Sequence, residues 1–315
     1  MPLTEIREEL WPGLPLDAWK ETHDTLRLWS QIVGKIKLEL EPMINHWWQV
    51  PLYVSARGLT TLPIPYADQV FQMDFDLIDH VMNIVTEDGE SRSIRLKPRT
   101  VADFYHETMY ALRSLGIEVL IWTTPVEMPE RIPFELDTKH SAYDRDYAEK
   151  FWKVLVQADR VMQVFRSRFI GKNSPVHFFW GGFDIAVSRF SGRRAPEHEP
   201  TPDLAHHVTL EAYSHEVSSC GFWPGEGLGT PAFYAYVYPE PEGFSTFPVE
   251  PKEAYYHQGL GEFILPYDVV RAADSPDDIL LSFFQSTYEA AARLGKWDRA
   301  SLERSPGQSQ KGMYH

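Results

Sequence analysis

The chain has 315 residues, of which 43% are hydrophobic and 24% charged, and its formal net charge is −15. This composition is typical of a globular protein with room for two domains, and it argues against nucleic acid or an anionic membrane as a partner. The single cysteine, Cys220, excludes internal disulfides and sites built from several cysteines. No basic and apolar leader and no long apolar run occurs, so we expect a cytoplasmic protein without membrane spans.

Apolar spacing in the first half predicts a helix followed by an antiparallel sheet. Large or apolar side chains recur every three or four residues, at Trp19, Thr22, Leu26, Trp29 and Val33. This period indicates an amphipathic helix, which Gly34 is expected to end. Alternating residues predict strands at 36–40, 46–57 and 70–77, a hairpin turn at 87–90, and then a capped helix at 100–116.

The second half repeats this order. Helices are expected at 147–169 and 275–295, and between them lie predicted strands at 177–190, 212–218, 233–238 and 255–265. Gly34-Lys35 precedes His46-Trp47-Trp48 just as Gly171-Lys172 precedes His177-Phe178-Phe179. We therefore predict an α+β fold of two antiparallel β-sheet halves flanked by helices, related by internal duplication. Coincidence between two aromatic segments is the alternative.

The expected organisation has four parts. The first half covers residues 1–122, a connection covers 123–145, the second half covers 146–300, and a mobile tail covers 301–315. A long loop at 191–209, rich in proline and histidine, is expected near a site.

Several longer strings carry a resemblance to a known family. They are Trp11-Pro12-Gly13-Leu14-Pro15-Leu16, Ala56-Arg57-Gly58-Leu59-Thr60-Thr61, His177-Phe178-Phe179-Trp180-Gly181, Phe190-Ser191-Gly192-Arg193-Arg194-Ala195-Pro196 and Ser214-His215-Glu216-Val217-Ser218-Ser219. Together they resemble a bacterial domain-of-unknown-function family, numbered 5996, over nearly the whole chain. Because no reaction is assigned to that family, the resemblance implies kinship and adds no mechanism.

The candidate catalytic residues lie in the second half. They are His177, Asp184, His215 and Glu216. A bulge at Gly181-Gly182 would bring His177 to the side of Asp184, and we expect His177 and His215 on adjacent strands facing a common cavity. Such a cluster could perform acid–base chemistry, or the two histidines could ligate a divalent metal. A buried hydrogen-bonded network is the alternative.

The candidate substrate-binding residues surround this cluster. They are Arg189, Arg193, Arg194, Tyr213, Glu211 and Glu240. Three arginines within six residues of so acidic a chain predict capture of a carboxylate or phosphate, with internal ion pairing as the alternative. Glu211 and Tyr213 are expected to share one face of a strand, and Glu240 could lie at a pocket rim or in an exposed turn.

Two classes of function remain open. The first is an enzyme that acts on a small anionic, partly apolar substrate through the histidine and carboxylate centre, with or without a metal. The alternative is a non-catalytic ligand-binding or interaction protein that uses an aromatic pocket and the arginine patch. Neither nucleic acid nor membrane is an expected partner; the sequence identifies no cofactor and leaves the oligomeric state open.

Overall fold

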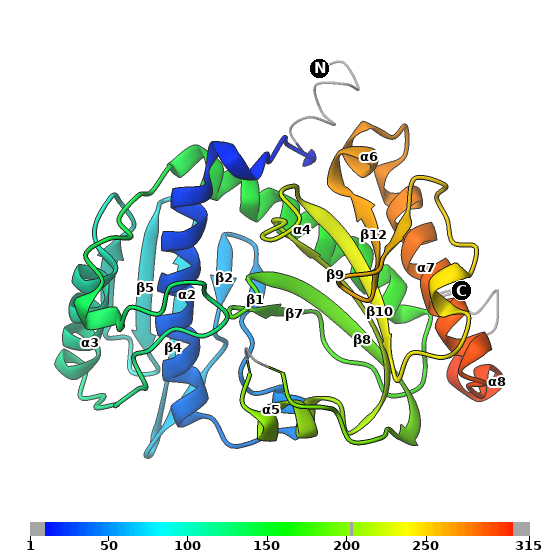
Figure 1. The fold of residues 1–315 in the computed structure, drawn as a ribbon. Helices are drawn as coiled ribbons and strands as arrows, with labels where there is room; N and C mark the ends of the chain where they lie inside the picture. Colours follow the sequence, from blue (N-terminus) through cyan, green and yellow to red (C-terminus); the bar gives the residue numbers. More distant parts are fainter. Residues whose placement is uncertain (1–9, 202–203, 305–315) are drawn as a thin grey trace, which may run out of the picture.

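Two six-stranded antiparallel sheets form the framework of the protein in this computed structural model, which describes residues 10–201 and 204–304 (Figure 1). In the first sheet the order is β1-β2-β4-β5-β6, and β3 pairs with β4. Its strands are β1 (Tyr53–Ser55), β2 (Gly58–Thr60), β3 (Ile64–Tyr66), β4 (Gln69–Asp76), β5 (Val81–Thr86) and β6 (Ser91–Arg95). In the second sheet the order is β11-β12-β10-β9-β8-β7. Its strands are β7 (His177–Phe179), β8 (Asp184–Arg194), β9 (His215–Trp223), β10 (Ala232–Tyr238), β11 (Tyr255–His257) and β12 (Glu262–Pro266).

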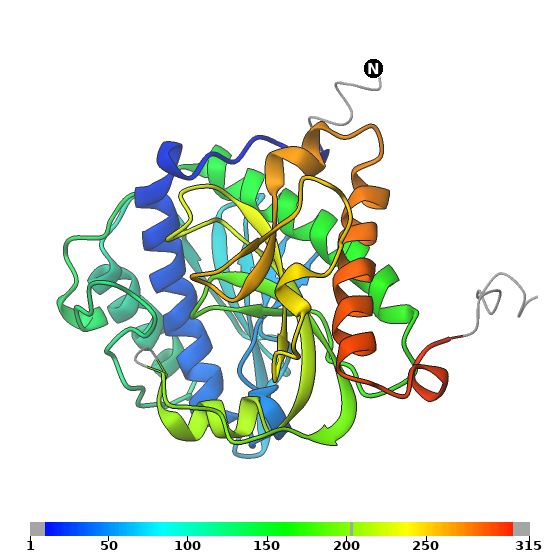
Figure 2. The ribbon, with the colours of Figure 1, turned by 45° about the vertical axis from the view of Figure 1, so that its right-hand side comes forward.

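Helices cover one face of each sheet. Those on the first sheet are α2 (Lys20–Leu40) and α3 (Val101–Ser114), and those on the second are α4 (Arg145–Ser167), α6 (Tyr267–Ala272) and α7 (Pro276–Leu294). Figure 2 shows α4 and α7 along the same side of the second sheet. The short helices are α5 (His206–Ala212), α8 (Arg299–Leu302) and the 3₁₀ turns η1 (Leu16–Ala18), η2 (Asn45–Trp47), η3 (Phe134–Leu136) and η4 (Phe244–Thr246).

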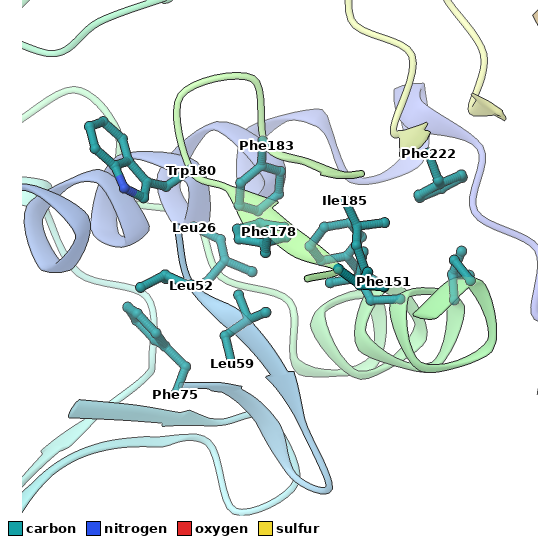
Figure 3. Packing of buried hydrophobic residues seen from close by; sticks show 14 of the residues in the cluster. Leu26, Leu52, Leu59, Phe75, Phe151, Phe178, Trp180, Phe183, Ile185 and Phe222 are labelled. Atoms are coloured by element: carbon teal, nitrogen blue, oxygen red, sulfur yellow. The ribbon is translucent and has the colours of Figure 1, made fainter. Parts of the chain in front are cut away.

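The two sheets meet at an isolated bridge between their edge strands. The Leu52 N–H donates to the Phe178 carbonyl at 2.9 Å, and the Phe178 N–H donates to the Leu52 carbonyl at 2.8 Å. Helix α4 packs across this junction, with Phe151 stacked on Phe183 at 4.8 Å between ring centroids. Figure 3 shows side chains from both sheets and from α2 and α4 in one continuous cluster. The halves therefore share a single core.

The α+β class is confirmed. The predicted helices and strands with a regular spacing of apolar residues are among the most accurate predictions. Strand β4 buries Phe71, Met73 and Phe75 on one face, as the alternation predicts. Helix α3 begins where Thr100 accepts a hydrogen bond from the Asp103 N–H, which is the predicted cap. Each half begins with a long helix, continues with six antiparallel strands and ends with a helical segment, but the second half also has α5 between β8 and β9. Duplication itself stays a prediction, as do the domain boundaries.

The predicted strand at 36–40 is wrong, because α2 continues through Gly34 to Leu40. The helix needs a glycine there, since a Cβ at position 34 would lie 2.1 Å from Nε1 of Trp180. The alternating lysines that suggested a strand are buried in the helix instead. Lys35 donates to the Trp122 and Thr124 carbonyls, and Lys37 donates to the Pro51 carbonyl. Tertiary contacts therefore override the local pattern.

The predicted strand at 46–57 is also wrong over most of its length. His46 and Trp47 form η2 with φ angles of 61° and 62°, and only Tyr53–Ser55 is a strand. The left-handed backbone of His46 is held by the Glu211 carboxylate, which accepts its N–H at 3.1 Å. That partner is far away in sequence, so no local pattern could reveal it.

In the second half, three predicted segments are divided differently. Residues 177–190 are two strands, β7 and β8, with Gly181-Gly182 in the turn between them rather than in a bulge. Residues 255–265 are also two strands, and the loop expected at 191–209 is shortened because β8 reaches Arg194 and α5 begins at His206. Of the predicted tail, 301–304 contribute to α8 and to a bridge between Glu303 and Phe169, while 305–315 lie outside the described residues. No helix of the described residues is apolar over the length needed to cross a membrane.

Candidate functional site

The two faces of the second sheet differ in chemistry. Directly paired residues of antiparallel strands share a face, and successive residues along a strand point to opposite faces, so the register assigns each side chain. The face under α4, α6 and α7 is apolar except for the buried pair Arg189 and Ser218. The other, which we name the tyrosine face, carries Asp184, Ser188, Ser219, Tyr234, Tyr236 and Glu262. Four of these, Asp184, Ser188, Tyr236 and Glu262, are half-buried, so this face is in part accessible.

His177 lies on the same face as Asp184, because it pairs with Ala186 across the β7–β8 hairpin. It is only 1% exposed and packs against the rings of Trp48 and Tyr53 at 5.9 and 5.5 Å. Burial, reinforced by the charge of Lys37, lowers the pKa of His177 to about 3. The imidazole is thus neutral and buried among aromatic rings, and its Nε2 makes no hydrogen bond with the described residues.

His215 does not join His177. Strand β8 separates β9 from β7, so the prediction of adjacent strands is wrong. His215 packs instead against His46, with 5.6 Å between ring centroids. Its neighbour Glu216 accepts hydrogen bonds from Arg193 at 2.6 and 2.9 Å. The four predicted catalytic residues are therefore dispersed. In residues 10–201 and 204–304, no three or more His, Cys, Asp or Glu side chains are arranged to hold a metal ion.

The three predicted anion-binding arginines have three different environments. Arg189 is 1% exposed under the helices, with its guanidinium carbon 3.4 Å from the Phe165 ring centroid, and burial lowers its pKa to about 10. Arg193 pairs with Glu216 and donates to carbonyls that follow α7. Arg194 is exposed opposite His215. They do not form one patch.

The remaining predicted binding residues also separate. Glu211 belongs to α5, not to a strand, and accepts the His46 N–H. Tyr213 follows α5 and places its hydroxyl 3.3 Å from that of Tyr236, at the border of the tyrosine face. Glu240 accepts a hydrogen bond from Tyr256 at 2.5 Å in an exposed turn.

The structure assembles a different centre, around Asp184. Tyr234 donates its hydroxyl proton to Asp184 Oδ2 at 2.5 Å. It reaches across β9 because Gly221 lies beneath its ring, where a Cβ would be 2.4 Å from the tyrosine hydroxyl. Burial raises the pKa of Asp184 to about 6, although the Tyr234 hydrogen bond and the charge of Arg27 oppose the rise. Burial, followed by the charge of Asp184, raises the pKa of Glu262 to about 7.

A third carboxylate lies beside the β7–β8 turn. The position that a Cβ of Gly182 would occupy is 2.6 Å from Asp184 Oδ1 and 3.8 Å from Glu127 Oε2, so the two carboxylates border the same space. Arg27 of α2, 3% exposed, fixes the surrounding segments by donating to the Gly181 carbonyl, the Glu127 carbonyl and the Glu226 carboxylate. Arg27 therefore positions the β7–β8 turn and the segments that carry Glu127 and Glu226.

Aromatic and hydroxyl side chains complete the tyrosine face. Ser188 donates to Ser219 at 3.0 Å, and Tyr213 meets Tyr236 as described above. A small apolar cluster, separate from the main core, lines the same face: Phe179, Ala186, Trp223, Leu228, Ala232, Tyr234, Tyr236 and Ile264. The surface is thus aromatic, hydroxyl-rich and acidic.

The sequence interpretation missed Tyr234, Tyr236, Glu262 and Glu127. The first two were detectable, because Tyr234, Tyr236 and Tyr238 alternate in one strand and must share a face. Glu262 and Glu127 had no comparable pattern, since their approach to Asp184 depends on how the sheet and the 117–143 segment fold. Only Asp184 belongs to both the predicted and the observed centre.

The fold and this surface define an α+β protein in which one sheet presents an acidic, tyrosine-rich face on the side away from its helices. A family model described as "Family of unknown function (DUF5996)" matches residues 11–304. The chain therefore belongs to this family, and the resemblance seen in the sequence is confirmed over most of its length. No curated protein and no solved structure matches it.

Proposed function

We propose that the tyrosine face binds a small cationic, partly apolar molecule, such as an organic amine. The observation that carries the proposal is the meeting of Asp184 and Glu262 with Tyr234 and Tyr236 on one partly accessible surface. Carboxylates attract a cation, and the faces of tyrosine rings bind ammonium groups through their quadrupole. A bound cation would also stabilise the ionised form of both acids, whose pKa values burial now raises.

The tyrosine face carries negative charge and so favours a cationic ligand, whereas the sequence-based hypothesis expected an anionic substrate. That hypothesis depended on three arginines, of which Arg189 lies on the other face of the sheet and Arg193 is paired with Glu216. The basic group nearest the tyrosine face, Arg27, is bound to the Glu226 carboxylate and to two carbonyls. The charge balance at the face therefore favours a cation.

Binding can be tested by isothermal titration with a panel of alkyl and aromatic amines, using carboxylates of the same shape as controls. We expect an amine to bind, and Asp184→Asn or Glu262→Gln to weaken it by about tenfold or more, the value of one charge-assisted contact. Glu87→Gln removes an exposed carboxylate from the turn that follows β5 and should leave affinity unchanged. Binding of the carboxylates instead, or amine binding that survives both variants, would refute the proposal.

A second candidate function, acid–base catalysis on the same ligand, is favoured by one specific observation. Asp184 and Glu262 have pKa values raised to about 6 and about 7, and Asp184 is hydrogen-bonded to a tyrosine hydroxyl. Carboxyl groups that titrate near neutral pH can donate and accept protons efficiently. Hydrolysis of amides of the bound amine, with a pH profile that changes in Asp184→Asn, would establish catalysis. Binding without turnover would leave a ligand-binding protein.

A further inference from the structure

A second group of ionisable side chains lies at the far end of β8 and β9 from Asp184. It consists of Lys172, His46, His215 and Arg194, and we name it the basic cluster. Lys172 follows α4, His46 lies in η2, and Arg194 and His215 are paired where β8 ends and β9 begins. Figure 1 shows α5 below the second sheet, and this helix packs against η2.

The contact between Lys172 and His46 fixes the state of the imidazole. The Lys172 Nζ is 2.7 Å from His46 Nε2, and His46 Nδ1 is 3.0 Å from the Ala212 carbonyl. An ammonium group only donates and a carbonyl only accepts, so Nε2 accepts and Nδ1 carries the proton. His46 is therefore neutral, and burial together with the charges of Lys172 and His215 lowers its pKa.

Arg194 and Lys172 approach His215 from different elements. Arg194 is the directly paired residue of the neighbouring strand, and Lys172 reaches the cluster through His46, whose ring is 5.6 Å from that of His215. Burial lowers the pKa of His215, and the charges of Lys172 and Arg194 lower it further. Both long side chains are exposed, and neither forms an ion pair with any of the described residues.

Negative charge in the basic cluster is limited. Glu211 is the acid that acts on His46, Lys172 and His215, and its Oε1 already accepts the His46 N–H. Glu216, next to His215, is bound by Arg193. Gathering two cations and two imidazoles around one engaged carboxylate is unfavourable unless a further anion is supplied.

We propose that Lys172, His215 and Arg194 form a binding site for the oxyanion of a small molecule, a phosphate or carboxylate group. Arg194 provides a planar fork of donors, Lys172 an ammonium group held beside His46, and His215 an imidazole that gains a proton when the anion arrives. The site is distinct from the tyrosine face, and it does not depend on the function proposed there. Of the three arginines that the sequence predicted to bind an anion, this site keeps Arg194, and Lys172 and His215 take the place of Arg189 and Arg193.

Inorganic phosphate is a suitable probe, measured by NMR on the whole protein. Phosphate should raise the pH at which the His215 imidazole titrates. Over the pH range in which phosphate keeps one charge state, it should bind more tightly as the pH falls and His215 gains its proton. Lys172→Met and Arg194→Met should each weaken binding by about tenfold. Both positions are exposed, and retained folding can be checked by circular dichroism.

Lys296→Met is the matched control, because it removes the same charge from an exposed side chain that follows α7 and lies outside the basic cluster. We expect it to leave phosphate affinity nearly unchanged. An equal loss in the control would mean that phosphate senses only the general charge of this surface, and the site would be refuted. A His215 titration that does not respond to phosphate would refute it as well. A carboxylate probe in place of phosphate identifies which oxyanion is preferred.

Discussion

Replacing Asp184 by Asn is expected to stabilise the folded protein at neutral pH. Asp184 is half-buried, and its pKa is raised from the ordinary value of 3.8 to about 6. A group whose pKa rises on folding holds its proton more tightly in the folded state than in the unfolded state. Ionising it therefore costs stability, and asparagine, which never ionises, avoids that cost.

The size and pH window of the effect follow from the same shift. A rise from 3.8 to about 6 corresponds to about 3 kcal/mol. Because the carboxylate is partly accessible, solvent screening reduces the expected gain to about 1–2 kcal/mol. Below pH 3.8 Asp184 is protonated in both states, so wild type and variant should differ little. As the pH rises from about 4 to about 6 the wild type loses stability relative to Asp184→Asn, and above that range the difference stays constant.

Urea unfolding of both proteins between pH 4 and pH 8 would measure this difference, with fixed buffer and ionic strength. Asp76→Asn is a control of opposite sign. Asp76 accepts hydrogen bonds from Arg57 and from the Ile78 and Asp79 N–H groups, and these partners lower its pKa against the effect of burial. Its replacement should destabilise the protein at neutral pH. If Asp184→Asn were also destabilising, and by the same amount at every pH, Asp184 would be a structural carboxylate and its proposed role would lose support.

Two further predictions concern packing and positioning. Gly34→Ala stabilises an ordinary helix by about 1 kcal/mol, but here it should lower the free energy of unfolding by about 2 kcal/mol, because its Cβ would meet the Trp180 indole. Urea unfolding should show that this loss largely vanishes in a Trp180→Leu background, and a stabilised single variant would contradict the prediction. Arg27→Met should cost about 3 kcal/mol in the same assay, because it removes a buried guanidinium that holds three partners and leaves the Glu226 carboxylate, among the described residues, with only Lys20, at 3.6 Å. It should also raise the pKa of Asp184 further, as measured by carboxyl NMR, because it removes a nearby positive charge; an unchanged titration of Asp184 would show that Arg27 does not act on the tyrosine face.

Sequence patterns located the elements whose stability is mainly local. Strand β4 alternates cleanly, α3 has its own cap at Thr100, and α7 begins at Pro276 directly after the predicted cap Ser275, so period and cap residues were sufficient. The failures at 36–40 and 46–57 share one physical cause. In both segments the deciding contacts come from residues more than eighty positions away, such as Trp180 for α2 and Glu211 for η2. Single-sequence periodicity contains no information about such partners.

The candidate site was predictable in part for a related reason. Asp184 was identified because its strand alternates, and the side on which it lies was correct. His177 was expected on the side of Asp184 through a bulge, and His215 on the strand next to that of His177, whereas the strand order inserts β8 between the two histidines. Glu262 is seventy-eight positions from Asp184 in the printed sequence, yet the charge of Asp184 raises its pKa. Which polar residues meet on a sheet depends on strand order and curvature, and these emerge only from the assembled fold.

The tyrosine face is difficult to explain as a device for stability. A sheet that rests its other face on helices needs only ordinary polar residues toward solvent. Here that face instead holds Asp184 and Glu262 where burial raises the pKa of both, and it leaves Tyr236 only half-buried. Each of these features makes folding less favourable than a conventional polar face would, and proteins retain such costs chiefly where they serve binding or catalysis. The buried guanidinium of Arg27 donates a hydrogen bond to the Gly181 carbonyl and so holds the turn beside Asp184 in place. An acidic surface whose carboxyl groups are unfavourably buried, together with a hydrogen-bonded support for it, is the arrangement expected of a site that must keep its geometry when a ligand arrives.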